Sequence, residues 1–154
     1  MTEAWQLEKM RVQYKDTDQM GIVHHGNYVT WFEVGRTEWM RNYGIAYKKM
    51  ENLGLLLPVI DVNVNYKKSA HFDDCIAIFT KISNLSPVRL EFLYEARKIS
   101  EKEFKQTVKK EAIEPFGELL AKGSTMHMWV NQKWKPARIN KEAPEVYTAL
   151  QSLI

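Results

Sequence analysis

The chain has 154 residues, of which 45% are hydrophobic and 12% aromatic, so it is long enough for one substantial core and too short to divide comfortably into two. Its 22 Lys and Arg against 19 Asp and Glu give a net charge of +3, without the clustered basic face of nucleic-acid-binding proteins. These values predict one globular domain over residues 1–154 and disfavour nucleic acid as a partner.

The N-terminal segment and the apolar runs of the chain favour a soluble, cytoplasmic protein. Residues 1–10, MTEAWQLEKM, carry charges where a secretory signal needs a continuous apolar stretch. No run reaches the roughly 18 apolar residues of a membrane span. Cys75 is the single cysteine, so we expect neither an internal disulfide nor a cysteine-built zinc cluster, and we interpret it as a small core residue.

The first elements predicted are a strand and a structured loop. Met10, Val12 and Tyr14 alternate with polar residues, which predicts a strand over Glu8–Tyr14. Lys15–Gly26 follows and is expected to be a structured loop, because several of its residues favour turns. These residues are Asp16, Thr17, Asp18 and Gly21.

A helical period begins at Asn27, which is a candidate N-cap, and ends at Gly44, where a left-handed cap fits. The helix is expected to be about 16 residues long, or about 24 Å. Gly35 near its middle costs about 1 kcal/mol relative to alanine, which predicts that another element passes close by. Apolar residues three and four positions apart form its stripe, which we interpret as core: Tyr28, Trp31, Phe32, Gly35, Trp39 and Tyr43.

The second half of the chain has the alternating pattern of strands. Strands are predicted at Ile60–Tyr66, Cys75–Ser83, Val88–Ile99 and Glu118–Val130, and a terminal helix at Lys141–Leu153. The segment 100–117 mixes charges with isolated apolar residues, so it either extends a hairpin or forms a short helical excursion. The order predicts an α+β fold in which a five-stranded antiparallel sheet wraps one long helix. Its unpaired edge strands favour edge-to-edge dimerisation.

The loop and the helix start, residues 16–28, read D-T-D-Q-M-G-I-V-H-H-G-N-Y. This segment resembles the hotdog-fold acyl-CoA thioesterases of the 4-hydroxybenzoyl-CoA thioesterase type, including the branch encoded beside the Tol-Pal genes. The signature of that family contains D-x-D-x-x-G-x-V before an aromatic that begins the helix. The resemblance continues through W-F-E-V-G-R-T-E-W-M, V-N-Y-K-K-S-A-H-F-D-D and L-L-A-K-G-S-T-M-H-M-W-V, and spans about residues 8 to 132.

The resemblance implies thioester hydrolysis with Asp18 as the catalytic carboxylate. An aspartate is ionised near neutral pH, so Asp18 can act as nucleophile or as general base, and the sequence does not choose between them. The backbone N–H of His25 is the implied oxyanion donor at the helix start, where a helix dipole favours negative charge. Its imidazole is either a helper or a bystander. Gly21 and Gly26 are expected to shape the approach of the acyl chain.

The substrate implied is an acyl thioester of coenzyme A or of acyl carrier protein, with no separate cofactor. Tyr28, Lys67, Lys68 and Arg89 are the further substrate-binding candidates, the three cations as phosphate contacts, although such cations are often simply solvated. Active sites between subunits are implied, so a homodimer or a homotetramer is expected. A metal site at His24 and His25 is not expected, because neighbouring residues project apart.

Two alternatives remain at this stage. The first is a dehydratase-like or acyl-binding hotdog protein, in which an acid on the helix, Glu33 or Glu38, has to be catalytic. The second is a dimeric scaffold without activity. The identity of the acyl group is not predicted, since the tryptophans and tyrosines suit both aromatic and aliphatic chains.

Overall fold

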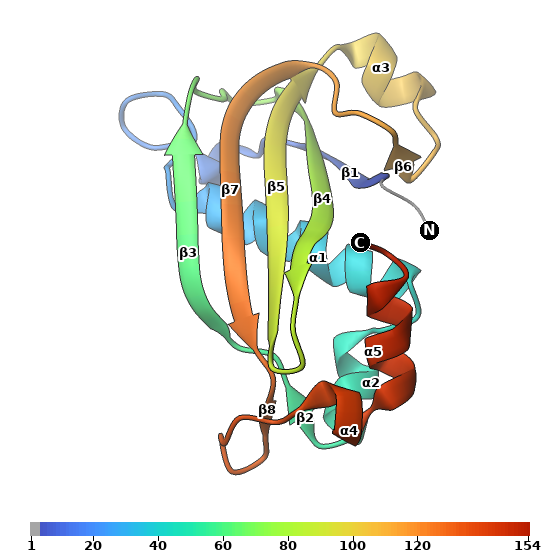
Figure 1. Ribbon diagram of the computed structural model, residues 1–154. Coiled ribbons are helices and arrows are strands. Elements are labelled where there is room, and N and C mark those ends of the chain that lie inside the picture. The colour runs from blue at the N-terminus through green and yellow to red at the C-terminus, as the bar shows by residue number, and fades with distance from the viewer. Residues whose placement is uncertain (1–3) are drawn as a thin grey trace.

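The computed structural model describes residues 4–154. Within this range the chain forms a sheet of six antiparallel strands in the order β3-β7-β5-β4-β1-β6, with the long helix α1 (Asn27–Asn42) lying across one face (Figure 1). The strands are β1 (Trp5–Arg11), β3 (Val59–Tyr66), β4 (Cys75–Leu85), β5 (Arg89–Ile99), β6 (Glu111–Ala112) and β7 (Glu118–Met128). The predicted α+β layout is confirmed, and the predicted count of five strands is one too few.

The core lies between α1 and the sheet, because helix and strands each turn their apolar residues to this layer. On β5 the side chains buried against this layer are Leu90, Phe92, Tyr94 and Ala96, which is the period of two expected for one covered face, while the buried Ile99 belongs to a second small core. From α1, Phe32 stacks on Tyr94 with 4.6 Å between ring centroids. Gly123 of β7 makes room for this ring, since a Cβ there would lie 2.4 Å from Phe32 Cε2.

The segment left open by the sequence, 100–117, covers part of the opposite face of the sheet. It forms the short helix α3 (Glu101–Gln106) and then β6, which pairs with β1 and is the sixth strand. Phe104 and Phe116 from this segment pack on a second small core of Leu7, Cys75 and Phe79. Cys75 is buried, as predicted.

Several boundaries differ from the predictions. β1 begins and ends three residues earlier, and Tyr14 starts a short 3₁₀ turn, η1 (Tyr14–Asp16). Gly26 occupies the N-cap position of α1, so Asn27 is its first helical residue. The terminal helix is two helices, α4 (Ile139–Glu142) and α5 (Pro144–Gln151), because Pro144 cannot continue the hydrogen-bond ladder of α4. α2 (Tyr47–Asn52) and the pair β2 (Leu55–Leu56) and β8 (Val130–Asn131) were not predicted.

Two glycines, one within α1 and one just after it, have the roles predicted for them. Gly44 has φ +74° just after α1, which is the left-handed conformation that ends helices. Gly35 faces β4, and a Cβ at this position would lie 2.4 Å from Thr80 Oγ1 and 3.0 Å from Ile78 Cγ2. The close approach of a strand therefore explains the helical glycine.

Among residues 4–154, every helix is too short or too polar to cross a lipid bilayer.

Candidate functional site

A cleft of about 330 Å³ lies where the loop before α1 meets the end of β3. It brings together residues from three separate stretches of the chain. It is lined by Asp18, Met20, Ile22, Val23, His25, Tyr28, Tyr66, Lys67, Lys68 and Ser69. Five of the predicted site residues thus share one cleft, and Gly21 and Gly26 adjoin it in the sequence.

Asp18 is held by a tight turn. Its backbone N–H donates to Ile22 O at 2.9 Å, and its carbonyl accepts from Gly21 N at the same distance. Gly21 has φ +80°, a conformation that favours glycine. The side-chain Oδ1 accepts from Met20 N at 2.9 Å, and Oδ2 has no hydrogen-bond donor among residues 4–154. The turn thus orients the carboxylate and leaves one oxygen available.

Asp16 has a different role in the same loop. Its Oδ2 accepts a hydrogen bond from Gln13 N at 2.9 Å, which caps η1, and its carbonyl accepts from His24 N and from Asn27 Nδ2. Asp16 is one of the residues expected to favour a turn in this loop, and its side-chain bond to the backbone agrees with that. Asp16 therefore connects the loop to the first turn of α1.

His25 lies two residues before the first residue of α1, next to the N-cap Gly26. Its backbone N–H has no hydrogen-bond acceptor among residues 4–154, so this donor is available to a ligand. The next N–H, of Gly26, donates to His24 Nδ1 at 3.1 Å, so His24 Nδ1 is an acceptor and carries no proton in this arrangement. Gly26 has an ordinary helical φ of −65°, and a Cβ there would lie 3.2 Å from the His24 ring.

Tyr66 is a cleft residue that the sequence analysis did not select. Its hydroxyl donates to His25 O at 2.8 Å, and its ring packs edge-to-face on Tyr28 with 5.3 Å between centroids. Tyr28 is buried and its hydroxyl accepts from Ala70 N at 3.2 Å; burial raises the pKa of Tyr28. Partial desolvation also raises the pKa of Tyr66, so both phenols stay protonated near neutral pH.

The three predicted cations differ in their surroundings. Lys68 Nζ lies 2.8 Å from Glu118 Oε2, and this contact lowers the pKa of Glu118. Lys67 has no ion-pair partner among residues 4–154 and lines the cleft. Arg89 on β5 lies opposite Met128 of β7, and Tyr66 on β3 lies opposite Ala121 of the same strand β7. Met128 and Ala121 are seven residues apart. This separation is about 23 Å at 3.3 Å per residue, so a single chain does not bring Arg89 to the cleft.

The acids on α1 lie away from the cleft. Glu33 Oε2 is 3.9 Å from Arg36 Nη2, and Glu38 contacts Arg41. Neither lines the cleft, so the geometry does not support the dehydratase-like alternative.

His127 is a buried histidine outside the cleft. Its Nε2 lies 2.8 Å from Thr125 Oγ1 and its Nδ1 lies 3.2 Å from Leu57 O. Because a carbonyl only accepts, Nδ1 carries the proton, and the Thr125 hydroxyl donates to Nε2. Burial, together with the positive charge of Arg36, lowers the pKa of His127 to about 4. We therefore interpret it as a neutral core residue.

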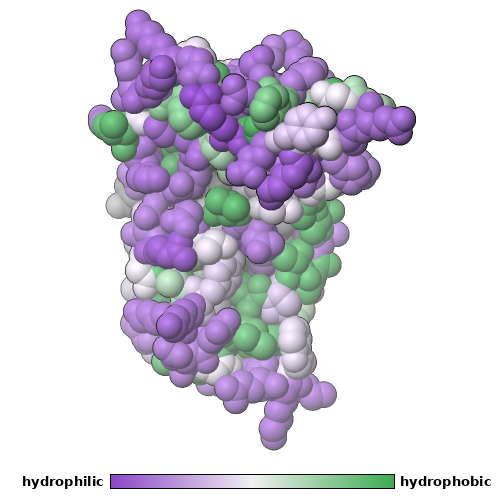
Figure 2. All heavy atoms as spheres, turned by 180° about the vertical axis from the view of Figure 1, so that it is seen from behind, coloured by the Kyte–Doolittle hydropathy of each residue, from purple (hydrophilic) through white to green (hydrophobic). Residues whose placement is uncertain are grey.

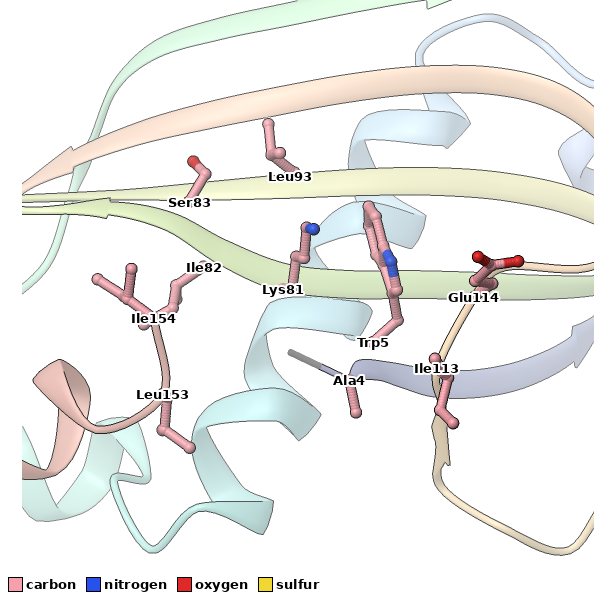
Figure 3. A pocket seen from close by; sticks show the side chains of 10 residues that line it. All are labelled: Ala4, Trp5, Lys81, Ile82, Ser83, Leu93, Ile113, Glu114, Leu153 and Ile154. Atoms are coloured by element: carbon pink, nitrogen blue, oxygen red, sulfur yellow. The ribbon is translucent and has the colours of Figure 1, made fainter. Parts of the chain in front are cut away.

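The larger cavity of about 600 Å³ lies near the C-terminus and offers less chemistry (Figure 3). Its ionisable side chains are Lys81, whose ammonium lies over the Trp5 ring, and Glu114. The remaining walls are mostly apolar, and none of the predicted site residues is among them. Over residues 4–154 no group of three His, Cys, Asp or Glu is arranged to hold a metal ion. The cleft at Asp18 is therefore the candidate active site.

Comparisons with known proteins agree with the fold described above. Residues 20–105 match the model of the thioesterase superfamily. The putative acyl-CoA thioesterase YneP of Bacillus subtilis is 34% identical over 145 residues, which cover 94% of each chain. The DHNA-CoA thioesterase of Staphylococcus aureus is 32% identical, with a TM-score of 0.82 over 96% of this chain and 89% of that chain. SAV2348 from Staphylococcus aureus, solved in complex with CoA, is 17% identical with a TM-score of 0.77 over 99% and 87%, a likeness of fold alone.

Proposed function

Since the chain belongs to the thioesterase superfamily, we propose that it hydrolyses acyl-CoA thioesters with Asp18 as the catalytic carboxylate. Hydrolysis of acyl-CoA thioesters is the activity that the names of its relatives support. The observation that carries the assignment is that one cleft holds both Asp18 Oδ2 and the His25 N–H at the start of α1, neither of which has a hydrogen-bond partner among residues 4–154.

Two routes to hydrolysis are consistent with Asp18. As a general base, the carboxylate takes a proton from water while the water oxygen attacks the thioester carbon; the C–S bond then breaks and the thiolate takes the proton. As a nucleophile, Oδ2 attacks the carbon, the thiolate leaves, and water hydrolyses the mixed anhydride. Both routes release the acid and the free thiol, and both place negative charge on the thioester oxygen.

The backbone N–H of His25 is the proposed donor to that oxygen. It lies at the N-terminus of a 16-residue helix, whose dipole favours negative charge. One such donor is worth about 3 kcal/mol in the transition state. The Tyr66 hydroxyl supports this arrangement, because its bond to His25 O ties the residue before the N-cap to β3.

We further propose a homodimer formed through β3. Among residues 4–154, β3 is an edge strand that pairs only with β7, and most of its residues are exposed. Hydrophobic residues gather at the right of Figure 2. On β3, Ile60 is 47% exposed and Val62 is 43% exposed. An exposed apolar edge strand is a template for pairing with a second copy. Acyl carrier protein as the thiol carrier, the cytoplasmic location, a homotetramer and the Tol-Pal-associated branch remain predictions.

The decisive experiment compares wild type with Asp18→Asn on a panel of acyl-CoA esters. Asparagine retains an oxygen for the bond from Met20 N, so the turn should persist. We expect kcat to fall about 10²- to 10⁴-fold. Asp16→Asn is the matched control, since it changes the other carboxylate of the loop. Unchanged turnover in Asp18→Asn would refute the mechanism, and loss of water from a β-hydroxyacyl thioester would favour a dehydratase.

A further inference from the structure

A shallow groove of about 350 Å³ continues from the cleft along the outer face of the sheet. Lys67 lines both the cleft and the groove, so the two cavities adjoin at this residue. The groove is lined by Asn63, Asn65, Lys67, Leu93, Lys122, Gly123 and Ser124. From Asn63 to Lys67 it extends about 13 Å at 3.3 Å per residue.

These side chains lie on the face opposite α1. A Cβ on Gly123 would point at Phe32 of the helix, so its neighbours Lys122 and Ser124 face the other way. Leu93 likewise alternates with the buried Phe92 and Tyr94. The groove therefore begins at the active-site cleft and leads away from the core.

The polar side chains of the groove are without partners in the described part of the chain. Asn63, Asn65, Lys67, Lys122 and Ser124 make no side-chain hydrogen bond or ion pair with any residue in the described range 4–154. Two nearby carboxylates are already engaged. Glu95, which is opposite Lys122 in the sheet, lies 2.6 Å from Arg97 Nη2, and Glu118 is bound to Lys68. Two positive charges are thus left without neutralisation beside three neutral hydrogen-bonding side chains.

We propose that this groove binds the nucleotide end of coenzyme A, an inference that rests on the proposed function. Phosphate groups match the two ammonium groups, and adenine and ribose offer donors and acceptors to two amides and a hydroxyl. The thioester lies at Asp18, and the long pantetheine arm leaves the cleft past Lys67. Lys122 is the new phosphate contact, and Lys68, bound to Glu118, contributes less than Lys67.

The test measures binding of adenosine 3′,5′-bisphosphate by calorimetry to the full chain. The variants are Lys122→Gln in the groove and Lys48→Gln as a matched control, since Lys48 is exposed on α2 and has no ion-pair partner among residues 4–154. We expect Lys122→Gln to weaken binding about fivefold, near the upper limit for an exposed ion pair, and Lys48→Gln to leave it unchanged. Equal affinity in all three proteins, equal weakening in both variants, or no binding to wild type overturns the proposal.

A kinetic comparison separates the nucleotide from the rest of the substrate. Lys122→Gln should raise KM about fivefold for acyl-CoA, and this penalty should be missing for acyl-pantetheine, which has no nucleotide. An equal rise in both KM values would place Lys122 outside a nucleotide site. If wild type hydrolyses neither thioester, the proposed function fails, whereas the calorimetry still tests the groove because it needs no turnover.

Discussion

The close contact of α1 with β4 at Gly35 gives a sharp test of the packing that supports the site. Gly35 lies against β4, and a methyl group at this position would lie 2.4 Å from Thr80 Oγ1. The hydroxyl belongs to a fully buried, β-branched residue and has no hydrogen-bond partner in the described part of the chain. Thr80 therefore has little freedom to move aside. Gly35→Ala should strain this contact.

The expected magnitude follows from two opposing effects. Alanine in place of a helical glycine stabilises by about 1 kcal/mol. Overpacking a tight core costs about 1–3 kcal/mol. The net effect of Gly35→Ala is thus a loss of about 0–2 kcal/mol in the free energy of unfolding. In a Thr80→Ala background the obstructing hydroxyl is absent, so the same change should stabilise by up to about 1 kcal/mol. The coupling between the two sites is then about 1–3 kcal/mol.

Urea denaturation of the wild type, both single variants and the double variant measures this coupling at one fixed protein concentration, because association would shift the apparent stability. The sign of the Gly35→Ala effect should reverse between the two backgrounds. Additive effects would show that the helix and β4 are not in close contact at this point.

Three further predictions concern the site and the core. Tyr66→Phe removes the bond to His25 O and keeps the ring, so kcat should fall about tenfold with little change in KM. The control Tyr43→Phe removes a hydroxyl bond to Glu111 away from the cleft and should leave kcat unaltered. An equal fall in kcat in both variants would contradict a role for the Tyr66 hydroxyl. His127, with its folded-state pKa lowered to about 4, is neutral in the fold, so the unfolded chain takes up its proton first as pH falls below about 6.5. The contribution of neutral His127 to the free energy of unfolding is full above that pH and is lost as pH falls toward 4. Between pH 7 and 5 the free energy of unfolding of the wild type, measured by denaturant titration, should therefore fall by about 2 kcal/mol more than that of His127→Gln. Gly21→Ala should lower the free energy of unfolding by about 1 kcal/mol because of the φ of +80°, although no atom of residues 4–154 beyond its chain neighbours lies within 4 Å of the added Cβ. Gly21→Asn should cost less. An unchanged stability of Gly21→Ala would show that the turn relaxes.

Long amphipathic elements were predictable because their apolar residues repeat with one period. The helix around Trp31 and Trp39 and the strand around Phe92 each bury one face, and a single repeat in the sequence records that burial. Even the position of Gly35 was informative. A glycine inside a helix makes the helix less stable than an alanine would, so its presence suggests that a neighbouring element needs the space.

The segment 100–117 was unreadable for the opposite reason. α3 and β6 are short, and each supplies only isolated contacts, such as Phe104 and Ala112, to the second small core. No period develops over so few residues, and the capping box of Ser100 and Glu103, which fixes the start of α3, is a local signal that the mixed charges obscured. The predicted sheet therefore lacked one strand, β6.

The site was predictable where one continuous loop holds it and not where strands complete it. Asp18 and His25 are seven positions apart in a recognisable motif, whereas Tyr66 lies 41 positions beyond His25. Its place in the alternating pattern of this strand gave no sign of a functional role, and in the structure its side chain is 45% exposed at the end of β3. Only the position of the end of β3 beside the start of α1 reveals the bond to His25 O.

Arg89 shows how the proposed dimer would extend this reasoning. In one chain it lies about 23 Å from the cleft, at the Val59 end of β3, whereas the cleft is at the Tyr66 end. Two copies of β3 that pair antiparallel, in a register centred on the strand, bring the Val59 end of each next to the Tyr66 end of the other. Arg89 of one copy then approaches the cleft of its neighbour. A role for Arg89 in substrate binding consequently requires the dimer, so a substitution such as Val62→Lys that separates the copies should remove the effect of Arg89→Gln on KM; an unchanged Arg89→Gln effect in a monomer would disprove this arrangement.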